Sequence, residues 1–164
     1  MLKNDLLFAR KNEDVILPTK RNEDAAYDIY AYFEEESLVI NPGEIKLIPT
    51  GLYSVCSSEY YIQLGERGST GTNGLSLRAG IIDSGFRGEW FIPINNTTNR
   101  KIIITKEVSK VITLNDILLY PYSKAIASAL VIPVPKMNVK EITLEELKNY
   151  DSERGTTALG ASGK

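Results

Sequence analysis

A glycine-rich segment contains the residues best suited to bind an anion. Within Gly65–Gly74, four glycines stand among Arg67, one serine and two threonines. Small residues let backbone N–H groups approach an oxyanion, hydroxyl groups donate hydrogen bonds, and a guanidinium pairs with phosphate. The segment lacks the Gly-Lys-Ser/Thr end of a P-loop. It therefore indicates a phosphate-binding loop, with an ordinary flexible hairpin loop as the alternative.

Two aspartates are candidates for the accompanying chemistry. Asp83 ends an apolar stretch and precedes a Ser-Gly turn, so it could act as a general base toward water. The alternative is an aspartate that starts an Asx-turn. Asp28 stands between Tyr27 and Ile29, so strand alternation places it on the opposite face from both. It could hold a hydrated Mg²⁺, which uses few carboxylates, or it could be a solvated surface carboxylate.

The composition excludes other chemistries. The chain has 164 residues, 19 Lys+Arg, 21 Asp+Glu, no histidine and one cysteine, Cys56. Without histidine there is no Ser-His-Asp triad and no His-ligated zinc. Acid–base catalysis must then use Asp, Glu, Lys or Tyr. The net charge of −2 argues against nucleic acid as a partner, but a few arginines suffice for a small phosphorylated ligand.

The C-terminal segment differs in character from the rest. Residues 151–164 contain three glycines among Ser, Thr and Ala and cannot supply a core. We expect a single β domain over residues 1–150 and a mobile C-terminal arm over 151–164. The arm is either a frayed terminus or a segment that closes over a ligand, with Arg154 and backbone N–H groups facing phosphate.

Many short apolar runs separated by turn residues precede this arm. They predict an all-β, jelly-roll-like fold. The expected strands are Leu6–Ala9, Val15–Leu17, Leu38–Ile40, Ile45–Pro49, Leu52–Cys56, Tyr60–Leu64, Glu89–Ile94, Lys101–Thr105, Val108–Ile112, Ile117–Tyr122 and Ala129–Val134. The Ser/Thr-x-x-Glu spacing of Thr143 and Glu146 predicts one short helix, and a second helical piece is possible between Tyr122 and Ser128.

No stretch approaches 18 apolar residues, so we expect no membrane span. The first residues lack the apolar core of a signal peptide. We therefore expect a cytoplasmic location.

The order of these segments resembles the trimeric dUTP diphosphatases (dUTPases). Their five short motifs are matched, in order, by residues Ala25–Ile29, Glu66–Gly71, Gly80–Glu89, Ala125–Pro133 and Arg154–Gly163. The resemblance covers about residues 15 to 164, and the third motif is the closest match. Each motif alone is a weak signal, whereas five in order are a strong one.

The resemblance implies hydrolysis of dUTP to dUMP and pyrophosphate, which keeps uracil out of DNA and supplies dUMP. It implies that Asp83 orients and deprotonates the attacking water. Arg67, with the amides of Gly68 and Ser69, would grip phosphate oxygens, and Asp28 would hold a water of the phosphate-bound Mg²⁺. Phe86 would stack on the deoxyribose, where the family usually has Tyr.

The same resemblance extends the expected substrate site to other segments. Leu75–Ile82, including Leu77, Ile81 and Ile82, would supply backbone groups that read the uracil edge. The arm would reach a neighbouring subunit's site, with Arg154 on the γ-phosphate, Leu159 over the base and Gly160 beside it. A homotrimer with three shared sites and arm exchange follows.

Several positions depart from the family pattern. Gly68 follows Arg67 where serine is common, and Ser128 stands where glutamine is frequent. Leu77 replaces a frequent polar uracil-reading residue, and Leu159 replaces phenylalanine. Losing an aromatic stack would cost about 1 kcal/mol of nucleotide affinity.

These departures leave alternatives open. One is a diphosphatase for another deoxynucleoside triphosphate, and a dCTP deaminase is a related possibility. Another is a regulatory protein on this scaffold that binds a repressor, if the chain is phage-encoded. The simplest is a structural all-β trimer without a ligand.

Overall fold

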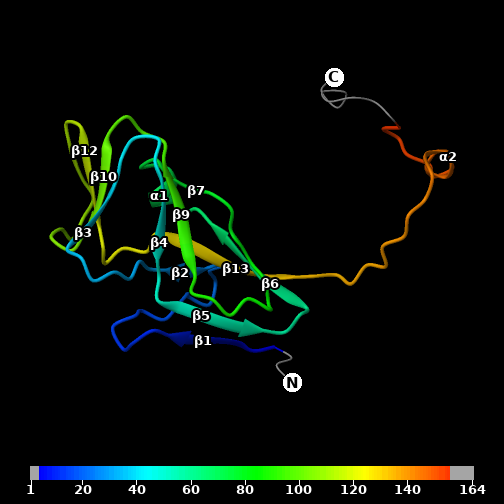
Figure 1. Ribbon diagram of the computed structural model, residues 1–164, viewed down its shortest axis with the longest axis horizontal. Coiled ribbons are helices and arrows are strands. Elements are labelled where there is room, and N and C mark those ends of the chain that lie inside the picture. The colour runs from blue at the N-terminus through cyan, green and yellow to red at the C-terminus, as the bar shows by residue number, and fades with distance from the viewer. Residues whose placement is uncertain (1–3, 156–164) are drawn as a thin grey trace.

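The computed structural model describes residues 4–155, and short strands dominate it (Figure 1). The strands form four small sheets. With strands in spatial order, one sheet contains β1 (Leu6–Arg10) and β5 (Leu52–Cys56), and a second contains β11 (Ile112–Leu114), β12 (Ile117–Pro121), β10 (Lys101–Thr105) and β3 (Ser37–Ile40). The third sheet contains β2 (Tyr27–Ile29), β13 (Ala127–Pro133), β6 (Tyr60–Gly65) and β8 (Ile81–Ile82). The fourth sheet contains β4 (Ile45–Pro49), β9 (Phe91–Asn96) and β7 (Leu75–Leu77). Two four-residue helices, α1 (Gly68–Gly71) and α2 (Leu144–Leu147), complete the described part. The all-β prediction is confirmed.

Alternation of buried and accessible side chains explains why these runs form strands. Along β5, Leu52, Ser54 and Cys56 are buried while the residues between them are partly exposed. Strand geometry sends successive side chains to opposite faces, so such a run buries one face and leaves the other accessible. The pairs β1–β5 and β4–β9 each run antiparallel over five residues.

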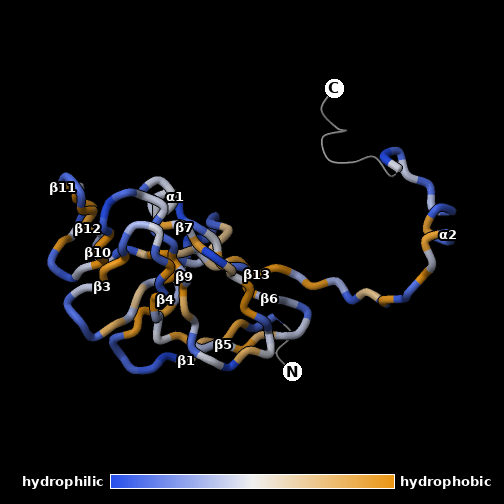
Figure 2. Tube along the Cα trace, turned by 45° about the horizontal axis from the view of Figure 1, so that its top comes forward, coloured by the Kyte–Doolittle hydropathy of each residue, from blue (hydrophilic) through white to orange (hydrophobic). Residues whose placement is uncertain are grey.

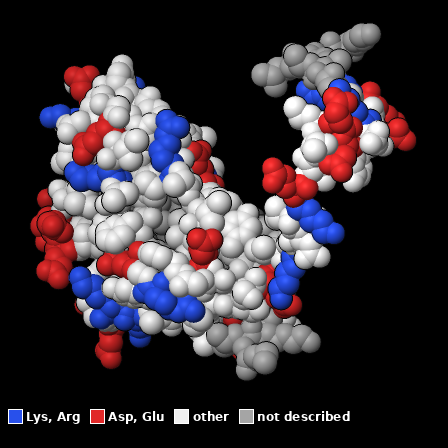
Figure 3. Space-filling model, turned by 45° about the vertical axis from the view of Figure 1, so that its right-hand side comes forward, with Lys and Arg blue, Asp and Glu red and all other residues white. Residues whose placement is uncertain are grey.

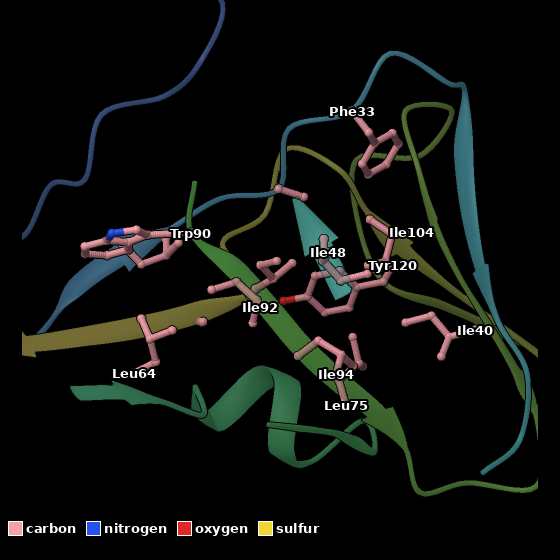
Figure 4. Packing of buried hydrophobic residues seen from close by; sticks show 14 of the residues in the cluster. Phe33, Ile40, Ile48, Leu64, Leu75, Trp90, Ile92, Ile94, Ile104 and Tyr120 are labelled. Atoms are coloured by element: carbon pink, nitrogen blue, oxygen red, sulfur yellow. The ribbon is translucent and has the colours of Figure 1, made fainter. Parts of the chain in front are cut away.

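The core lies between the sheets and is built mainly from isoleucine and aromatic side chains (Figure 4). Trp90 and Tyr120 are the largest fully buried side chains. Phe8 meets the Trp90 ring edge-on, with 5.4 Å between ring centroids. In Figure 4, the Tyr120 ring lies between Ile48 and Ile94. The strands that carry predicted site residues are held in place by their own buried side chains, such as Ile29 of β2 and Leu64 of β6, which pack in this core.

Beyond β13 the chain leaves the β body (Figure 1). Residues 135–155 are exposed throughout, and apolar side chains alternate with polar ones along this stretch (Figure 2). Met137 is 80% exposed and Val139 is 96% exposed. The predicted helix forms as α2, with the expected capping box in which the Glu146 N–H donates to Thr143 Oγ1 at 3.1 Å. The division at residue 150 stays a prediction.

Several expected elements are wrong. Val15–Leu17 is not a strand: Pro18 follows it, and Val15 is buried against Gly51 instead of pairing with a strand. The possible helix between Tyr122 and Ser128 is a turn followed by β13, which pairs with β2 and β6. Within Val108–Ile112, only Ile112 belongs to a strand.

Helix α1 was not anticipated, because Gly-Ser-Thr-Gly has low helix propensity. The surface carries interspersed charges (Figure 3), in keeping with the net charge of −2. Within residues 4–155, no helix is long and apolar enough to span a membrane.

Candidate functional site

Three adjacent strands bring the first, second and fourth predicted segments together. In the sheet β2–β13–β6, Ser128 lies opposite Asp28 on one side and opposite Gly65 on the other. Directly opposed residues of antiparallel strands point to the same face. The Asp28 and Ser128 side chains therefore share a face, and Gly65 leaves that face open beside them. Arg67 follows two residues after Gly65.

Arg67 is fixed at this face by two interactions. Its Nη2 pairs with Asp28, at 3.0 Å from Oδ1 and 3.2 Å from Oδ2. Its Nη1 donates to the Ala125 carbonyl at 3.2 Å. The side chains are 25% and 36% exposed, so the pair is desolvated in part but remains open to a ligand. Arg67 and Asp28 are both site residues predicted from the sequence, and the structure brings them together.

A single helical turn presents the amides that follow Arg67. The fully buried Thr70 accepts a hydrogen bond on Oγ1 from the Arg67 N–H at 2.9 Å, and donates to the Arg67 carbonyl at 3.0 Å. These two hydrogen bonds between Thr70 and Arg67 close the turn of α1. The first N–H groups of a helix have no intrahelical acceptor. Those of Gly68 and Ser69 are therefore available to an anion beside Arg67.

Tyr120, which the sequence analysis did not select, connects this turn to the core. Its hydroxyl donates to the Ala125 carbonyl at 2.9 Å and lies 3.4 Å from Ser69 Oγ. Burial raises the pKa of the Tyr120 phenol, and the Ser69 hydrogen bond opposes that shift in part. The phenol therefore stays protonated near neutral pH. Tyr120 reads as an ordinary core residue in the sequence, so no signal there marks it.

These residues line an open pocket of about 960 Å³. Asp28, Arg67, Gly68, Ser69 and Ser128 all line it. Its remaining lining residues are Thr19, Lys20, Arg21, Glu23, Asp24, Ala25, Ala26, Glu66 and Lys124. The three additional cations were not predicted. Lys20 and Arg21 precede the first segment and Lys124 immediately precedes the fourth, so an inspection of the flanking residues would have found them.

Asp83 lies away from this pocket in the same chain. It follows β8, the opposite edge of the sheet from β2, which carries Asp28. Three strand spacings of about 4.8 Å put these two edges about 14 Å apart. Asp83 is exposed and does not line the Arg67 pocket. One chain therefore does not bring its own Asp83 to its own Arg67.

The loop that carries Asp83 is nevertheless held in place. Arg87 Nη1 donates to the carbonyls of Ser84 and Phe86, at 2.7 Å and 2.9 Å. Further on, the Trp90 N–H donates to the Leu52 carbonyl at 2.8 Å. These bonds fix the loop to β5, so Asp83 is exposed on an ordered support.

Phe86 packs within this loop. A Cβ on Gly88 would lie only 2.5 Å from Cζ of the Phe86 ring, so the close approach of ring and backbone requires glycine. The Phe86 side chain is 42% exposed. Part of the ring is therefore accessible, while its outer edge lies close to the Gly88 backbone.

The segment between the two regions, which runs from β7 to β8, contains Leu77, Ile81 and Ile82. Glu66 Oε1 accepts from Ser76 Oγ at 2.8 Å and from the Leu77 N–H at 2.9 Å. These bonds lower the pKa of the Glu66 carboxyl. Its contribution to stability is therefore present above the carboxyl's ordinary pKa and is lost as pH falls through the lowered value. The Leu77 N–H is engaged within the chain, and neither Ile81 nor Ile82 lines the Arg67 pocket.

Gly80 lies in the connection between β7 and β8. Its φ of +139° and the 2.9 Å between a hypothetical Cβ and the Leu64 carbonyl oxygen exclude a side chain. The Leu64 N–H donates to the Gly80 carbonyl at 2.7 Å, which holds this connection against β6. Of the C-terminal candidates, Arg154 lies in the exposed stretch beyond α2, while Leu159 and Gly160 lie outside the described residues.

The donor set limits the kind of metal that the pocket can hold. Within residues 4–155, no three His, Cys, Asp or Glu side chains gather as a metal cage. Asp28 offers a carboxylate that is 36% exposed, beside the glycine-rich loop Gly65–Gly74. That arrangement fits a hydrated Mg²⁺, which keeps several waters and uses one or two carboxylates together with substrate phosphates.

Sequence comparisons define the class to which this site belongs. The dUTPase family model matches residues 12–113. A deoxyuridine 5'-triphosphate nucleotidohydrolase of Nautilia profundicola is 31% identical, over 97% of this chain and 99% of its own length. The enzyme of the same name from Clostridioides difficile is 32% identical, over 97% of this chain and 98% of its own. The chain belongs to the dUTPase family.

Solved structures agree with this assignment at the level of the fold. The dUTPase of Staphylococcus bacteriophage 80alpha in complex with dUpNHpp superposes with a TM-score of 0.76, covering 99% of this chain and all of that one at 24% identity. The dUTPase of Staphylococcus aureus phage phi11 gives a TM-score of 0.67 at 20% identity, over 85% of this chain and 96% of that one.

Proposed function

We propose that this protein hydrolyses dUTP to dUMP and pyrophosphate in a Mg²⁺-dependent reaction, within the cytoplasmic deoxynucleotide pool. The observation that carries the proposal is the pocket that unites Asp28, Arg67, Ser69 and Ser128. It supplies a guanidinium, free amides and a carboxylate in the arrangement that a triphosphate with its metal requires. Membership of the dUTPase family supports the choice of substrate.

We assign phosphate binding to the second segment, Glu66–Gly71. Arg67 would pair with phosphate oxygens, while the Gly68 and Ser69 amides donate to them. Ser128, opposite Asp28 in the sheet, would contact the substrate directly or through water. Most of the charge stabilisation that phosphoryl transfer needs would come from these preorganised donors.

Asp28 would hold a water of the bound Mg²⁺. When bound, the ion would neutralise charge on the phosphate oxygens. The Asp28–Arg67 pair keeps the carboxylate aimed into the pocket. Asp28 therefore has a positioning role toward the metal, and its charge is shared with Arg67 before substrate arrives.

Asp83 is the proposed general base. It would accept a proton from water while the water oxygen forms a bond to the α-phosphorus. The bond from that phosphorus to the bridging oxygen breaks, and its electron pair leaves with pyrophosphate. No covalent enzyme intermediate is needed, since a positioned water can attack in line.

The separation of Asp83 from Arg67 supports a shared site. Asp83 follows Ile82, which lies opposite Ile62 near the start of β6, whereas Arg67 lies beyond the other end of that strand. At about 3.4 Å per residue, the two groups are too far apart for a water activated by one to attack a phosphate held by the other. A homotrimer in which Asp83 of one chain meets Arg67 of a neighbour would remove this gap. In the same assembly, the arm with Arg154, Leu159 and Gly160 would cover a neighbour's site, with Arg154 on the γ-phosphate.

Base and sugar recognition would use the Asp83 side of the site. The accessible face of Phe86 would stack on deoxyribose and exclude a 2′-hydroxyl. Backbone groups of Leu77, Ile81 and Ile82 would face the uracil edge, although the Leu77 N–H already donates to Glu66. That engagement favours a second candidate, a diphosphatase that acts on another deoxynucleoside triphosphate as well.

A panel of nucleotides tests the proposal. The purified full chain should release pyrophosphate from dUTP in Mg²⁺, and much less from UTP, dCTP or dTTP. The Asp83→Asn variant should bind dUTP but lose turnover by about a thousandfold or more, since the base is removed. Equal turnover of dTTP would reject uracil specificity, and an active Asp83→Asn variant would reject the assigned base.

The same panel separates the remaining candidates. Ammonia release from dCTP would identify a deaminase. Nucleotide binding without turnover, together with a nucleotide-dependent affinity for a repressor protein, would identify a regulatory protein. Absence of binding to every nucleotide would leave a structural trimer.

A further inference from the structure

Lys124 lies in the turn between β12 and β13, and its side chain lines the Arg67 pocket. The turn is tightly held: the Lys124 N–H donates to the Pro121 carbonyl at 3.1 Å. The next carbonyl, that of Ala125, accepts from both Tyr120 and Arg67. The Lys124 backbone is thereby fixed next to the guanidinium that we assign to phosphate binding.

The other cations of the pocket are already engaged. Arg67 pairs with Asp28, and Arg21 pairs with Asp24. Lys20 is exposed, and its Nζ donates to the carbonyls of Asp24 and Arg21 at 3.0 Å and 3.4 Å. Their charge is therefore shared with carboxylates or carbonyls of the chain itself.

Lys124 differs from all three. It is half-buried, and among residues 4–155 no carboxylate lies within salt-bridge distance of it. Its Nζ lies 5.8 Å from the centre of the Tyr120 ring, a contact that orients the ammonium but does not cancel its charge. A partly desolvated ammonium in an open pocket gains strongly from an arriving anion.

We propose that Lys124 is a further substrate-binding residue, which contacts the β- or γ-phosphate of the nucleotide. This inference rests on the proposed hydrolysis of dUTP. The α-phosphorus must face the water activated by Asp83, and Asp83 is not part of this pocket. The cations of the pocket therefore bind the β- and γ-phosphates, which leave as pyrophosphate. Lys124 contributes to affinity for the triphosphate and takes no part in proton transfer.

Calorimetric titration of the intact protein with two ligands tests this role. In Lys124→Met, the Kd of a non-hydrolysable imido analogue of dUTP should rise about tenfold, as expected when a charge-assisted hydrogen bond is lost. The Kd of dUMP should stay within about twofold, because dUMP lacks the β- and γ-phosphates. KM for dUTP should rise with the analogue Kd, while kcat changes little. Lys124→Arg should restore most of the affinity, since the charge returns.

Lys110→Met is the matched control, because Lys110 is exposed and does not line the pocket. It should leave both Kd values unchanged. An unchanged analogue Kd in Lys124→Met, or equal losses for the analogue and dUMP, would overturn the role of Lys124 while hydrolysis by the unaltered protein stands. Failure of the unaltered protein to bind the analogue would instead overturn the proposed function, and with it this inference.

Discussion

The Arg67 pocket and the Asp83 loop differ in how completely one chain builds them. Around Arg67, the Asp28 side chain of β2 and the Ala125 carbonyl of the β12–β13 turn lie at hydrogen-bonding distance from the guanidinium, and Ser69 of α1 contacts Tyr120 of β12. Around Asp83, Arg87 and Trp90 fasten the loop to β5, yet the carboxylate itself is exposed. The Arg67 pocket is therefore assembled within one chain, whereas the Asp83 carboxylate has an ordered loop beneath it but, among the described residues, no partner side chains that complete a site.

This difference follows from strand order. The pocket uses the adjacent strands β2, β13 and β6, whereas Asp83 follows β8 at the far edge of that sheet. Although β8 adjoins β6, Ile82 lies opposite Ile62, so Asp83 lies toward the start of β6 while Arg67 follows its end; β2, which carries Asp28, is at the other edge of the sheet. The fold therefore separates the Arg67 pocket, to which we assign phosphate binding, from Asp83, the proposed general base, within each chain.

The largest expected effect comes from mixing two inactive variants. Asp83→Asn and Arg67→Gln should each be inactive alone. Co-expressed in one cell, they should assemble trimers with up to about a quarter of the normal sites intact, since each shared site draws its two groups from different chains. Pyrophosphate release from dUTP by the purified mixed assembly measures this recovery.

The control is a mixture of the two variants purified separately and combined without reassembly, which should stay inactive. A mixed assembly that contains both chains but shows no recovered activity would mean that each site takes Asp83 and Arg67 from the same chain. Assembly would then bring Asp83 and Arg67 of one chain together, and the separation of the two regions seen in the single chain would not hold.

A moderate effect is expected at the Asp83 loop. Gly88→Ala places a methyl group 2.5 Å from the Phe86 ring, so the ring must move. If Phe86 covers the deoxyribose, the ratio of kcat/KM for dUTP over UTP should fall by about tenfold, comparable to the loss of an aromatic contact. Gly85→Ala is the matched control, because no atom lies within 4 Å of the added methyl. Equal discrimination in both variants would remove Phe86 from sugar recognition.

The smallest expected effect concerns the stability of the Arg67 pocket. Thr70→Val keeps the shape of a fully buried side chain but removes the acceptor of the Arg67 N–H. The free energy of unfolding should fall by about 1–2 kcal/mol, the cost of an unsatisfied donor. Guanidinium denaturation at fixed protein concentration measures this loss.

Thr72→Val is the comparison, since Thr72 is exposed and its hydroxyl donates to the Gly68 carbonyl at 2.7 Å and to the Ser69 carbonyl at 3.5 Å without accepting from the Arg67 N–H. It should change the unfolding free energy by less than about 0.5 kcal/mol. Equal losses in the two variants would show that Thr70 has no special role in holding Arg67.

Part of the candidate site could be located from the sequence because its residues lie in short segments. Asp28, Arg67, Gly68, Ser69 and Ser128 were all named in advance, and all line one pocket. Strands such as Ile45–Pro49 and Lys101–Thr105 were predicted at their observed bounds, because apolar runs with clear flanking turns fix their ends.

What the sequence could not predict depends on tertiary contacts. Helix α1 is closed by the buried Thr70 despite poor propensity. Tyr120 has the pattern of a core residue, and only its hydroxyl contacts with Ala125 and Ser69 reveal a second role. Lys124 stands out only when the partners of every neighbouring cation are known.

The order of strands in one sheet also bears on protein concentration. With Asp28 and Asp83 on opposite edges, an isolated chain in the proposed assembly has no working centre. Dilution below the dissociation constant of the trimer would then silence the enzyme without unfolding it. Specific activity would rise steeply, and not linearly, as newly made subunits accumulate.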